Sequence, residues 1–159
     1  MLTALVHAGS TPGALAATLS SLVPAVAGGL MSHAVVALRQ GDAEAERIAD
    51  ALGAAAAFCT ASPWADAAGL ARGSWALLLE AGEEPGDGWI SCVERHFMRH
   101  ADSGRTALIP LGGVAGVAER AAMLANPRGL RAGLLVPRAE IVSGLRGKPP
   151  LRLSAIRRR

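Results

Sequence analysis

Three carboxylates directly follow a short apolar run in the middle of the chain. The run Trp75 to Leu79 holds five apolar residues, which predicts a strand covered on both faces, as in a parallel sheet between helices. Glu80, Glu83 and Glu84 come at its C-terminal end. Ligands of open α/β sheets bind at that edge, so these side chains are candidates for holding a metal ion or a sugar hydroxyl. A solvated acidic turn is the alternative interpretation.

A second group of polar side chains lies where the first apolar segment ends. His7 closes that segment, and Ser10 and Thr11 follow it in the turn HAGSTPG. Hydroxyls and backbone N–H groups at a helix N-terminus can hold a phosphate, and His7 is placed for a nucleotide site. Helix capping explains Ser10 and Thr11 equally well, and a hydrogen-bonded histidine at a strand end explains His7.

A thiol and two imidazoles recur at helical spacing later in the chain. Cys92, His96 and His100 are four residues apart, which places them on one stripe of a helix within reach of a zinc ion. The stripe lies beside an apolar helix face, so boundary residues of mixed character are the favoured interpretation. The chain has two cysteines, Cys59 and Cys92, which we expect to be reduced thiols.

Glycines cluster in the segment LGGVAG, which follows an apolar run. The segment has neither a phosphate-loop lysine nor a dinucleotide-binding order of glycines. We therefore expect a flexible loop there.

The chain alternates predicted strands and helices with short connections. The predicted strands are Leu2–His7, Ala34–Leu38, Ala54–Thr60, Trp75–Leu79, Thr106–Leu111 and Ala132–Val136. The predicted helices begin at Pro12 with Thr11 as cap, at Asp42, at Pro63, after Asp87, at Glu119 and near Pro137. Such alternation predicts an α/β fold, in one domain, with a mainly parallel sheet and helices on both of its faces.

Composition restricts the functional classes. The 159 residues suit one domain, and no run of 18 residues is apolar enough to suggest a membrane span. The N-terminal residues do not resemble a signal peptide, so a cytoplasmic location is the default expectation. Aromatic residues make up 3% of the chain and tyrosine is absent, which disfavours binding to single-stranded nucleic acid.

Positive charge is concentrated at the C-terminus. The formal net charge is +3, and residues 140–159 carry six Arg or Lys against one Glu, a net of +5 that leaves −2 for residues 1–139. We expect a basic tail over residues 144–159, with Gly144–Pro150 as linker. Residues 151–159 suit either a short helix or a disordered segment. The tail could contact an anionic membrane at its inner face, although a solvated terminus is commoner.

The order of these motifs resembles the family 2 glycosyltransferases, which have the nucleotide-diphospho-sugar transferase fold called GT-A. The resemblance spans residues 1–143 and rests on four segments in the family's order: HAGSTPGALAATLSSLVPA, AVVALRQGDAEAERIADALGA, GLARGSWALLLEAGEEPGDGWI and RAGLLVPRAEI. The third is similar to the family hallmark of an apolar strand, an acidic turn, Pro-Gly and a Trp-bearing helix. The chain looks like a short member of that family.

This resemblance implies a nucleotide-diphospho-sugar donor, an acceptor that the sequence does not identify, and a divalent metal, Mg²⁺ or Mn²⁺. The family's first metal-site carboxylate falls on Glu80 and its second on Gly82, with Glu83 and Glu84 as neighbouring acids. The arginines Arg128 and Arg131 would contact the diphosphate. The resemblance implies no residue for the catalytic base.

A catalytically inactive relative of the same fold is the alternative. Acids that the family uses are absent near residues 38–40, at Gly82 and near Arg131. Such a protein would act as an interaction or scaffold module, docking to a membrane surface through its arginine-rich tail.

Overall fold

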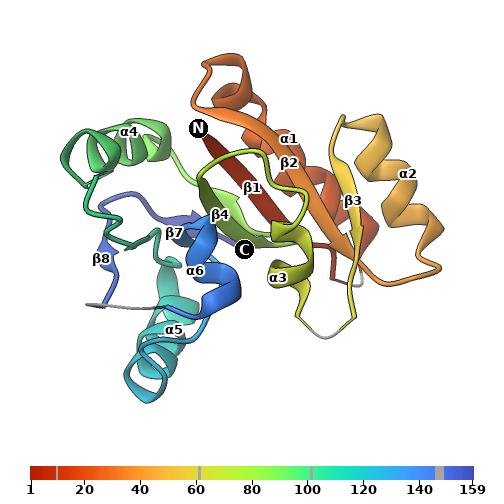
Figure 1. The fold of residues 1–159 in the computed structure, drawn as a ribbon. Helices are drawn as coiled ribbons and strands as arrows, with labels where there is room; N and C mark the ends of the chain where they lie inside the picture. The colour runs from red at the N-terminus through yellow and green to blue at the C-terminus, as the bar shows by residue number, and fades with distance from the viewer. Residues whose placement is uncertain (10, 61, 101, 146–148) are drawn as a thin grey trace.

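A seven-stranded sheet organises the chain, in the strand order β3-β2-β1-β4-β7-β6-β8 (Figure 1). The computed structural model describes residues 1–9, 11–60, 62–100, 102–145 and 149–159. The strands of this sheet are β1 (Leu2–His7), β2 (Met31–Leu38), β3 (Ala55–Phe58), β4 (Trp75–Glu80), β6 (Ala107–Leu108), β7 (Leu134–Pro137) and β8 (Leu151–Arg152). The predicted α/β class is confirmed.

One half of the sheet is parallel, as the alternating pattern predicts. Strand β1 pairs in parallel with β2 and β4, and β2 pairs in parallel with β3. Parallel neighbours need crossovers, and three helices supply them: α1 (Pro12–Ala27), α2 (Ala43–Ala51) and α3 (Pro63–Ala68). In the resulting register His7 lies beside Ala37 on one side and Glu80 on the other. The strand ends that carry the predicted site therefore meet at one edge.

The other half of the sheet is mixed, because β6 pairs in parallel with β8 while β7 is antiparallel to its neighbours, and the sheet as a whole is mainly parallel, as predicted. Strand β7 is antiparallel to both β4 and β6. The predicted strand over residues 106–111 is shorter, because only Ala107–Leu108 pairs as a strand with β7 and β8. Helix α6 (Arg138–Ser143) begins directly after β7, where we predicted a helix near Pro137.

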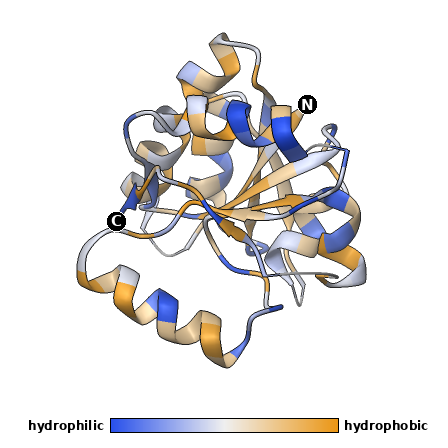
Figure 2. Ribbon diagram, turned by 90° about the vertical axis from the view of Figure 1, so that its left-hand side faces the viewer, coloured by the Kyte–Doolittle hydropathy of each residue, from blue (hydrophilic) through white to orange (hydrophobic). Residues whose placement is uncertain are grey.

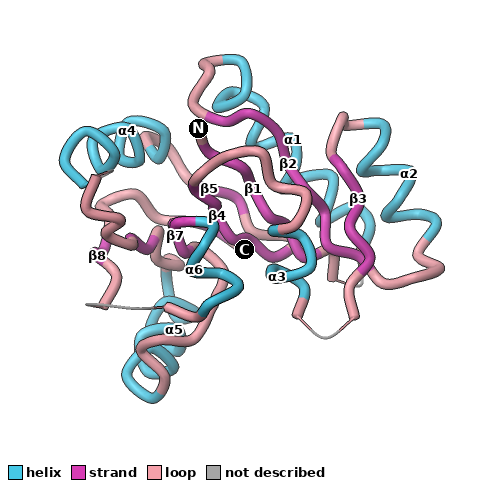
Figure 3. Tube along the Cα trace, in the orientation of Figure 1, coloured by secondary structure: helices cyan, strands magenta, loops and turns pink. Residues whose placement is uncertain are grey.

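Helices cover both faces of the sheet. Successive side chains of a strand point to opposite faces, so the apolar strands form a core on each face, and helices pack on both. One core combines Leu2, Ala4 and Val6 with residues of α1, α2 and α4 (Trp89–His100). The other combines Leu5 and Leu78 with residues of α3 and α6. Figure 3 shows the central strands running between these two helix layers. Within the described residues, no helix has both the length and the apolar character needed to cross a membrane.

Several predicted helix starts are present, among them that of α3 at Pro63. Helix α1 begins at Pro12 with Thr11 as N-cap, although the Thr11 side chain makes no capping hydrogen bond. Helix α2 has Asp42 as N-cap, and its Oδ1 accepts a hydrogen bond from the Ala45 amide at 3.1 Å. Ser10 lies outside the described residues.

The predicted flexible loop at LGGVAG is instead the start of helix α5 (Gly113–Ala125). We predicted this helix to begin at Glu119, and the start is wrong because the glycines before it have low helix propensity. Figure 2 shows α5 standing away from the body of the protein, with apolar residues along it. Its exposed apolar side chains include Val114, Val117 and Leu124.

The C-terminal segment is neither a helix nor a free tail. It runs along β6, where the Leu151 amide donates to the Thr106 carbonyl and the Leu153 amide to the Leu108 carbonyl, both at 2.9 Å. Its last strand, β9 (Arg157–Arg158), pairs with β5 (Glu84–Pro85) in a small antiparallel sheet. The basic tail thus ends as a strand against the acidic turn.

Candidate functional site

The C-terminal ends of β1, β2 and β4 form the edge at which we predicted a ligand site, and we call it the carboxyl edge. A cavity of about 230 Å³ opens there between the loop after β1 and the start of α2. Its lining includes Gly9, Thr11, Asp42 and Glu44. Of the predicted nucleotide-site residues, Thr11 lines this cavity and His7 lies one residue before it.

The turn after β4 is held firmly against the loop and helix that follow β1. The Ala81 amide donates to the His7 carbonyl at 2.9 Å. The Gly82 amide contacts both the Ala14 carbonyl, at 3.1 Å, and the Thr18 Oγ1 atom, at 2.9 Å. The acidic turn and the cavity are therefore neighbours on the same edge, and their relative position is fixed by backbone hydrogen bonds.

Glu83 points into the protein rather than into solvent. Its side chain is 2% exposed and forms an ion pair with Arg157, with 3.2 Å between Oε2 and Nε. The same Oε2 accepts a hydrogen bond from the Glu80 amide at 3.2 Å. These contacts give Glu83 a structural role in closing the turn.

Arg157 is the centre of this buried polar network. Its guanidinium donates to the carbonyls of Ile109, at 3.1 Å, and Ala132, at 2.7 Å, and it also pairs with Glu119 of α5. With Glu83, these contacts satisfy a side chain that is 2% exposed. One residue therefore joins the turn after β4, helix α5 and the entry to β7.

Two carboxylates, those of Glu83 and Glu119, share this single guanidinium. Burial raises the pKa of the Glu83 carboxyl, and the attraction of Arg157 opposes the rise. Burial also lowers the pKa of Arg157, against the attraction of Glu83 and Glu119. Because a guanidinium is effectively never deprotonated in proteins, Arg157 is the permanent charge of the network.

Gly133 makes room for the Arg157 guanidinium. A Cβ atom at this position would lie 2.4 Å from the Ile109 carbonyl oxygen and 2.6 Å from the Arg157 Cζ atom, and the backbone φ angle is +80°. We expect Gly133→Ala to lower the free energy of unfolding by about 1–3 kcal/mol more than Gly144→Ala, since overpacking adds to the cost of the left-handed conformation.

Gly144 is the matched control because its φ angle is +83° and a Cβ atom there would meet nothing within 4 Å. Urea unfolding of the two variants measures the difference. Equal losses of stability in Gly133→Ala and Gly144→Ala would contradict the steric explanation.

Glu80 and Glu84 are the predicted metal-site carboxylates that reach solvent. Glu80 has a side chain 35% exposed, and its Oε2 accepts a hydrogen bond from Arg159 Nη2 at 2.9 Å. Glu84 is exposed in β5. In the described part of the chain, no group of three or more His, Cys, Asp or Glu side chains is arranged to hold a metal ion. The metal assignment of Glu80, Glu83 and Glu84 stays a prediction.

The arginines at the C-terminus follow the acidic turn closely. Besides the pairs of Arg157 with Glu83 and of Arg159 with Glu80, the guanidinium of Arg158 lies 4.0 Å from the carboxylate of Asp87. Arg158 and Asp87 are solvent-exposed, so this third pair contributes little to stability. The carboxylates of Glu80 and Glu83 are therefore each paired with an arginine of the C-terminal strand or its end.

The two arginines predicted to contact a diphosphate lie in the turn between α5 and β7. Arg128 is exposed. The Arg131 guanidinium donates to the carbonyls of Gly129, at 3.2 Å, and Asn126. These contacts fold the turn on itself, and the role of both arginines in ligand binding stays a prediction.

The stripe of Cys92, His96 and His100 lies on α4, as predicted, but its members have different surroundings. His96 is buried, its ring meets Trp75 edge-on at 5.9 Å between centroids, and Nε2 donates to the Arg105 carbonyl at 2.7 Å. The Cys92 thiol is hydrogen-bonded to the Ser154 hydroxyl at 3.2 Å. His96 thus has the packing of a core residue.

The buried His96 should make stability depend on pH. Burial, His100 and Arg105 lower its pKa from the ordinary 6.5, against the hydrogen bond to the Arg105 carbonyl. The unfolded chain therefore takes up a proton first as pH falls. We expect the free energy of unfolding to decrease as pH falls through 6.5 towards the lower folded-state pKa.

Urea unfolding at about pH 7.5 and about pH 5.5 brackets the ordinary histidine pKa and checks this expectation. His96→Gln keeps an N–H donor for the Arg105 carbonyl and should reduce the pH dependence. An unchanged pH dependence in His96→Gln would assign it to other groups.

Sequence reasoning missed three residues that shape this region: Glu119, Arg157 and Arg159. We predicted a helix to begin at Glu119, and we expected Arg157 and Arg159 to belong to a basic tail. The sequence signal that could have indicated a strand there is the alternation of Leu151 and Leu153 with Arg152 and Ser154. Continued to residue 157, the same alternation would have placed Arg157 on the face of the two leucines.

Solved structures with a similar fold include chains of TarS, a glycosyltransferase from S. aureus. TarS 1–349 matches with a TM-score of 0.57 and 13% identity over 90% of this chain and 49% of that chain. The same protein in complex with UDP-GlcNAc matches with a TM-score of 0.57 at 12% identity, over 90% and 47%. Its complex with UDP matches with a TM-score of 0.52 at 12% identity, over 89% and 48%.

These comparisons show the fold. The present chain spans about half the length of those TarS chains. No protein-family model matches the sequence, and no curated protein matches it. The chain thus has a glycosyltransferase-like fold, which confirms the coarser part of the sequence resemblance, while family 2 and the GT-A type stay predictions.

Proposed function

We propose that this chain binds a nucleotide sugar at its carboxyl edge and transfers the sugar to an acceptor, as a family 2 glycosyltransferase of the GT-A type. The observation that carries the proposal is the juxtaposition, at one sheet edge, of the cavity after β1 and the Glu80 carboxylate after β4. The TarS chains of similar fold include complexes with UDP-GlcNAc and UDP. A uridine diphosphate donor is therefore the first to test.

The diphosphate is the part of the donor that needs positive charge. When its bond to the sugar breaks, negative charge develops on the leaving phosphate, and a positioned cation stabilises it. Arg159 is suited to this task because its guanidinium is held at the carboxyl edge by Glu80, at 2.9 Å, and 57% of its side chain is exposed. We assign it the role of diphosphate contact, oriented by Glu80.

No step of this proposal passes through a metal ion. A divalent cation prefers several oxygen ligands, and Glu83 is committed to Arg157. Glu80 would be the carboxylate to hold such an ion, in exchange for Arg159. We assign the catalytic base to no residue, and the acceptor is unspecified.

Calorimetry on the wild-type chain with UDP- and GDP-sugars, in EDTA and then with Mg²⁺ or Mn²⁺, tests donor binding. We expect saturable heat with at least one UDP-sugar. Absence of heat with every donor under every condition would refute the proposal. A transfer assay against the same donors then follows turnover.

The second candidate function is an interaction module without turnover. It is favoured by the ion pairs of Glu80 and Glu83 with C-terminal arginines, since those carboxylates already have cationic partners. Among the described residues of the tail, peripheral membrane contact would rest on Arg152, Arg158 and Arg159, because Arg157 is buried. Three such residues supply only about 3 kcal/mol at an anionic surface. Donor binding without hydrolysis or transfer would favour this function.

A further inference from the structure

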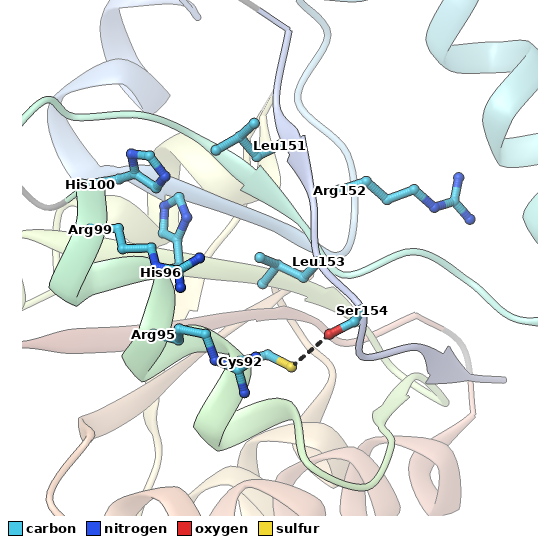
Figure 4. Close-up of a pocket in the computed structure, with 9 residues that line it drawn as sticks. All are labelled: Cys92, Arg95, His96, Arg99, His100, Leu151, Arg152, Leu153 and Ser154. Atoms are coloured by element: carbon cyan, nitrogen blue, oxygen red, sulfur yellow. Dashed lines mark hydrogen bonds between the residues drawn. The ribbon is translucent and has the colours of Figure 1, made fainter.

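A second cavity, of about 300 Å³, opens between α4 and the C-terminal segment (Figure 4). It shares no lining residue with the cavity at the carboxyl edge. Its lining comprises five residues of α4 and the four residues 151–154, and we call it the basic cavity. The wall from α4 includes Cys92, Arg95 and Arg99, and the opposite wall includes Ser154. The proposed donor site uses none of these residues.

The lining of the basic cavity contains three arginines and no carboxylate. A guanidinium keeps its charge in proteins, so this lining is positively charged. Among the described residues, no ion pair joins Arg95, Arg99 or Arg152 to an acidic side chain. Arginines gathered around a concave site without acidic partners attract anions, and their planar forks suit phosphate oxygens.

The spacing of the cationic groups suits one phosphate. Arg95 and Arg99 are four residues apart on α4, so they lie on the same helix face one turn apart. Figure 4 shows them on the side of α4 that carries Cys92, whose thiol meets Ser154 across the cavity at 3.2 Å. The Arg152 guanidinium points away from α4, as strand alternation requires.

The opposite wall of the basic cavity is partly apolar. Leu151 and Leu153 line it, and both are half-buried and pack against the core. A bare ion would leave this apolar wall unused, whereas a ligand with a short carbon skeleton would cover it. Cationic groups beside an apolar wall therefore favour a small organic phosphate.

A neighbouring cavity of about 460 Å³ shares His100 and Leu151 with the basic cavity. It is lined by Arg105, whose buried Nε has no hydrogen-bond partner among the described residues. A buried N–H without a partner is costly. Glu140 also lines that neighbouring cavity, whereas the basic cavity is lined by no carboxylate.

We propose that the basic cavity binds the phosphate group of a small phosphorylated molecule, through Arg95 and Arg99, with its carbon skeleton on Leu151 and Leu153. Nucleic acid fits the site less well, because its lining offers no Phe, Tyr or Trp ring for base stacking. This inference is independent of donor binding at the carboxyl edge.

Amide shifts of the ¹⁵N-labelled chain, titrated with inorganic phosphate and with glycerol 3-phosphate, test the proposal. We expect saturable shifts at residues 92–100 and 151–154, with glycerol 3-phosphate binding at least as tightly as phosphate. Arg95→Gln/Arg99→Gln should weaken binding at least about tenfold, which corresponds to about 1.4 kcal/mol. The matched variant Arg47→Gln/Arg120→Gln changes two exposed arginines on other helices and should bind normally.

Three results would overturn the proposal. The first is the absence of saturable shifts in these segments, and the second is equal weakening by the two double variants. The third is binding of RNA or of phosphatidylglycerol vesicles that depends on Arg95 and Arg99 while both phosphate probes fail. Inorganic phosphate binding without glycerol 3-phosphate would refute the role of the two leucines.

Discussion

Arg157→Met should lower the free energy of unfolding by about 3–5 kcal/mol, the usual result of removing one partner from a buried ion pair. The substitution leaves the buried Glu83 carboxylate and the Glu119 carboxylate without their shared cation. It also removes the donors to the carbonyls of Ile109 and Ala132. Since small domains are stable by only about 5–15 kcal/mol, the loss would be a large fraction of the total.

Urea unfolding monitored by tryptophan fluorescence measures this loss. Arg158→Gln is the matched control, because it changes the adjacent arginine, whose side chain is 72% exposed, and should cost little. The double variant Arg157→Met/Glu83→Leu should recover part of the stability by removing one buried charge that has lost its partner. A loss below about 1 kcal/mol in Arg157→Met would contradict the central place given to this residue.

Arg159→Gln should weaken binding of a UDP-sugar in EDTA at least about tenfold, because a hydrogen bond to a charged group contributes about 1.5–3 kcal/mol. Glu80→Gln should weaken it as well, since the Arg159 guanidinium then loses the carboxylate that positions it at 2.9 Å. Calorimetry on both variants measures the effect. Arg158→Gln again serves as control, because its side chain faces Asp87.

The response to metal distinguishes the two roles of Glu80. If Arg159 is the diphosphate contact, the wild-type chain binds the donor in EDTA, and Arg159→Gln binds it more weakly. The opposite result is donor binding that requires Mn²⁺, is lost in Glu80→Gln and is unchanged in Arg159→Gln. That result would assign the diphosphate contact to a metal ion held by Glu80 instead of to Arg159.

The parallel half of the fold was predictable because its signals are local. The runs of apolar residues in β1 and β4, the proline that starts α1 and the aspartate that caps α2 each act within a few residues. A helix between successive strands makes each connection a crossover between parallel strands, and the carboxyl edge follows from that arrangement. Glu80 was predicted at the C-terminal end of its strand, where the structure has it, and the structure adds that it is in register with His7 of β1.

The network around Arg157 was not predictable in the same way. It joins residues 74 and 38 positions apart along the chain, and a charge run at a terminus is ordinarily solvated. Likewise, an acid after a strand has the same local pattern whether it faces solvent, as Glu84 does, or is buried, as Glu83 is. Only the tertiary contact with Arg157 shows that Glu83 is buried and Glu84 is not.

The α4 stripe shows a third kind of ambiguity. Its helical spacing predicted that Cys92, His96 and His100 share a face, and all three line one cavity. Spacing could not show that Ser154 and the two leucines of the C-terminal segment complete that cavity, because the segment was expected to be a helix or disordered. What the stripe can bind therefore depends on residues 151–154, which are distant from α4 in the sequence.

Mapping the nucleotide-sugar site is the most direct test of the central claim. The ¹⁵N-labelled chain titrated with UDP-GlcNAc should show its largest saturable amide shifts at the carboxyl edge, in residues 7–9, 11–14, 42–45 and 80–83. Shifts confined to α4 and residues 151–154 would place the nucleotide in the basic cavity and contradict the proposed donor site, as would the absence of saturable shifts anywhere.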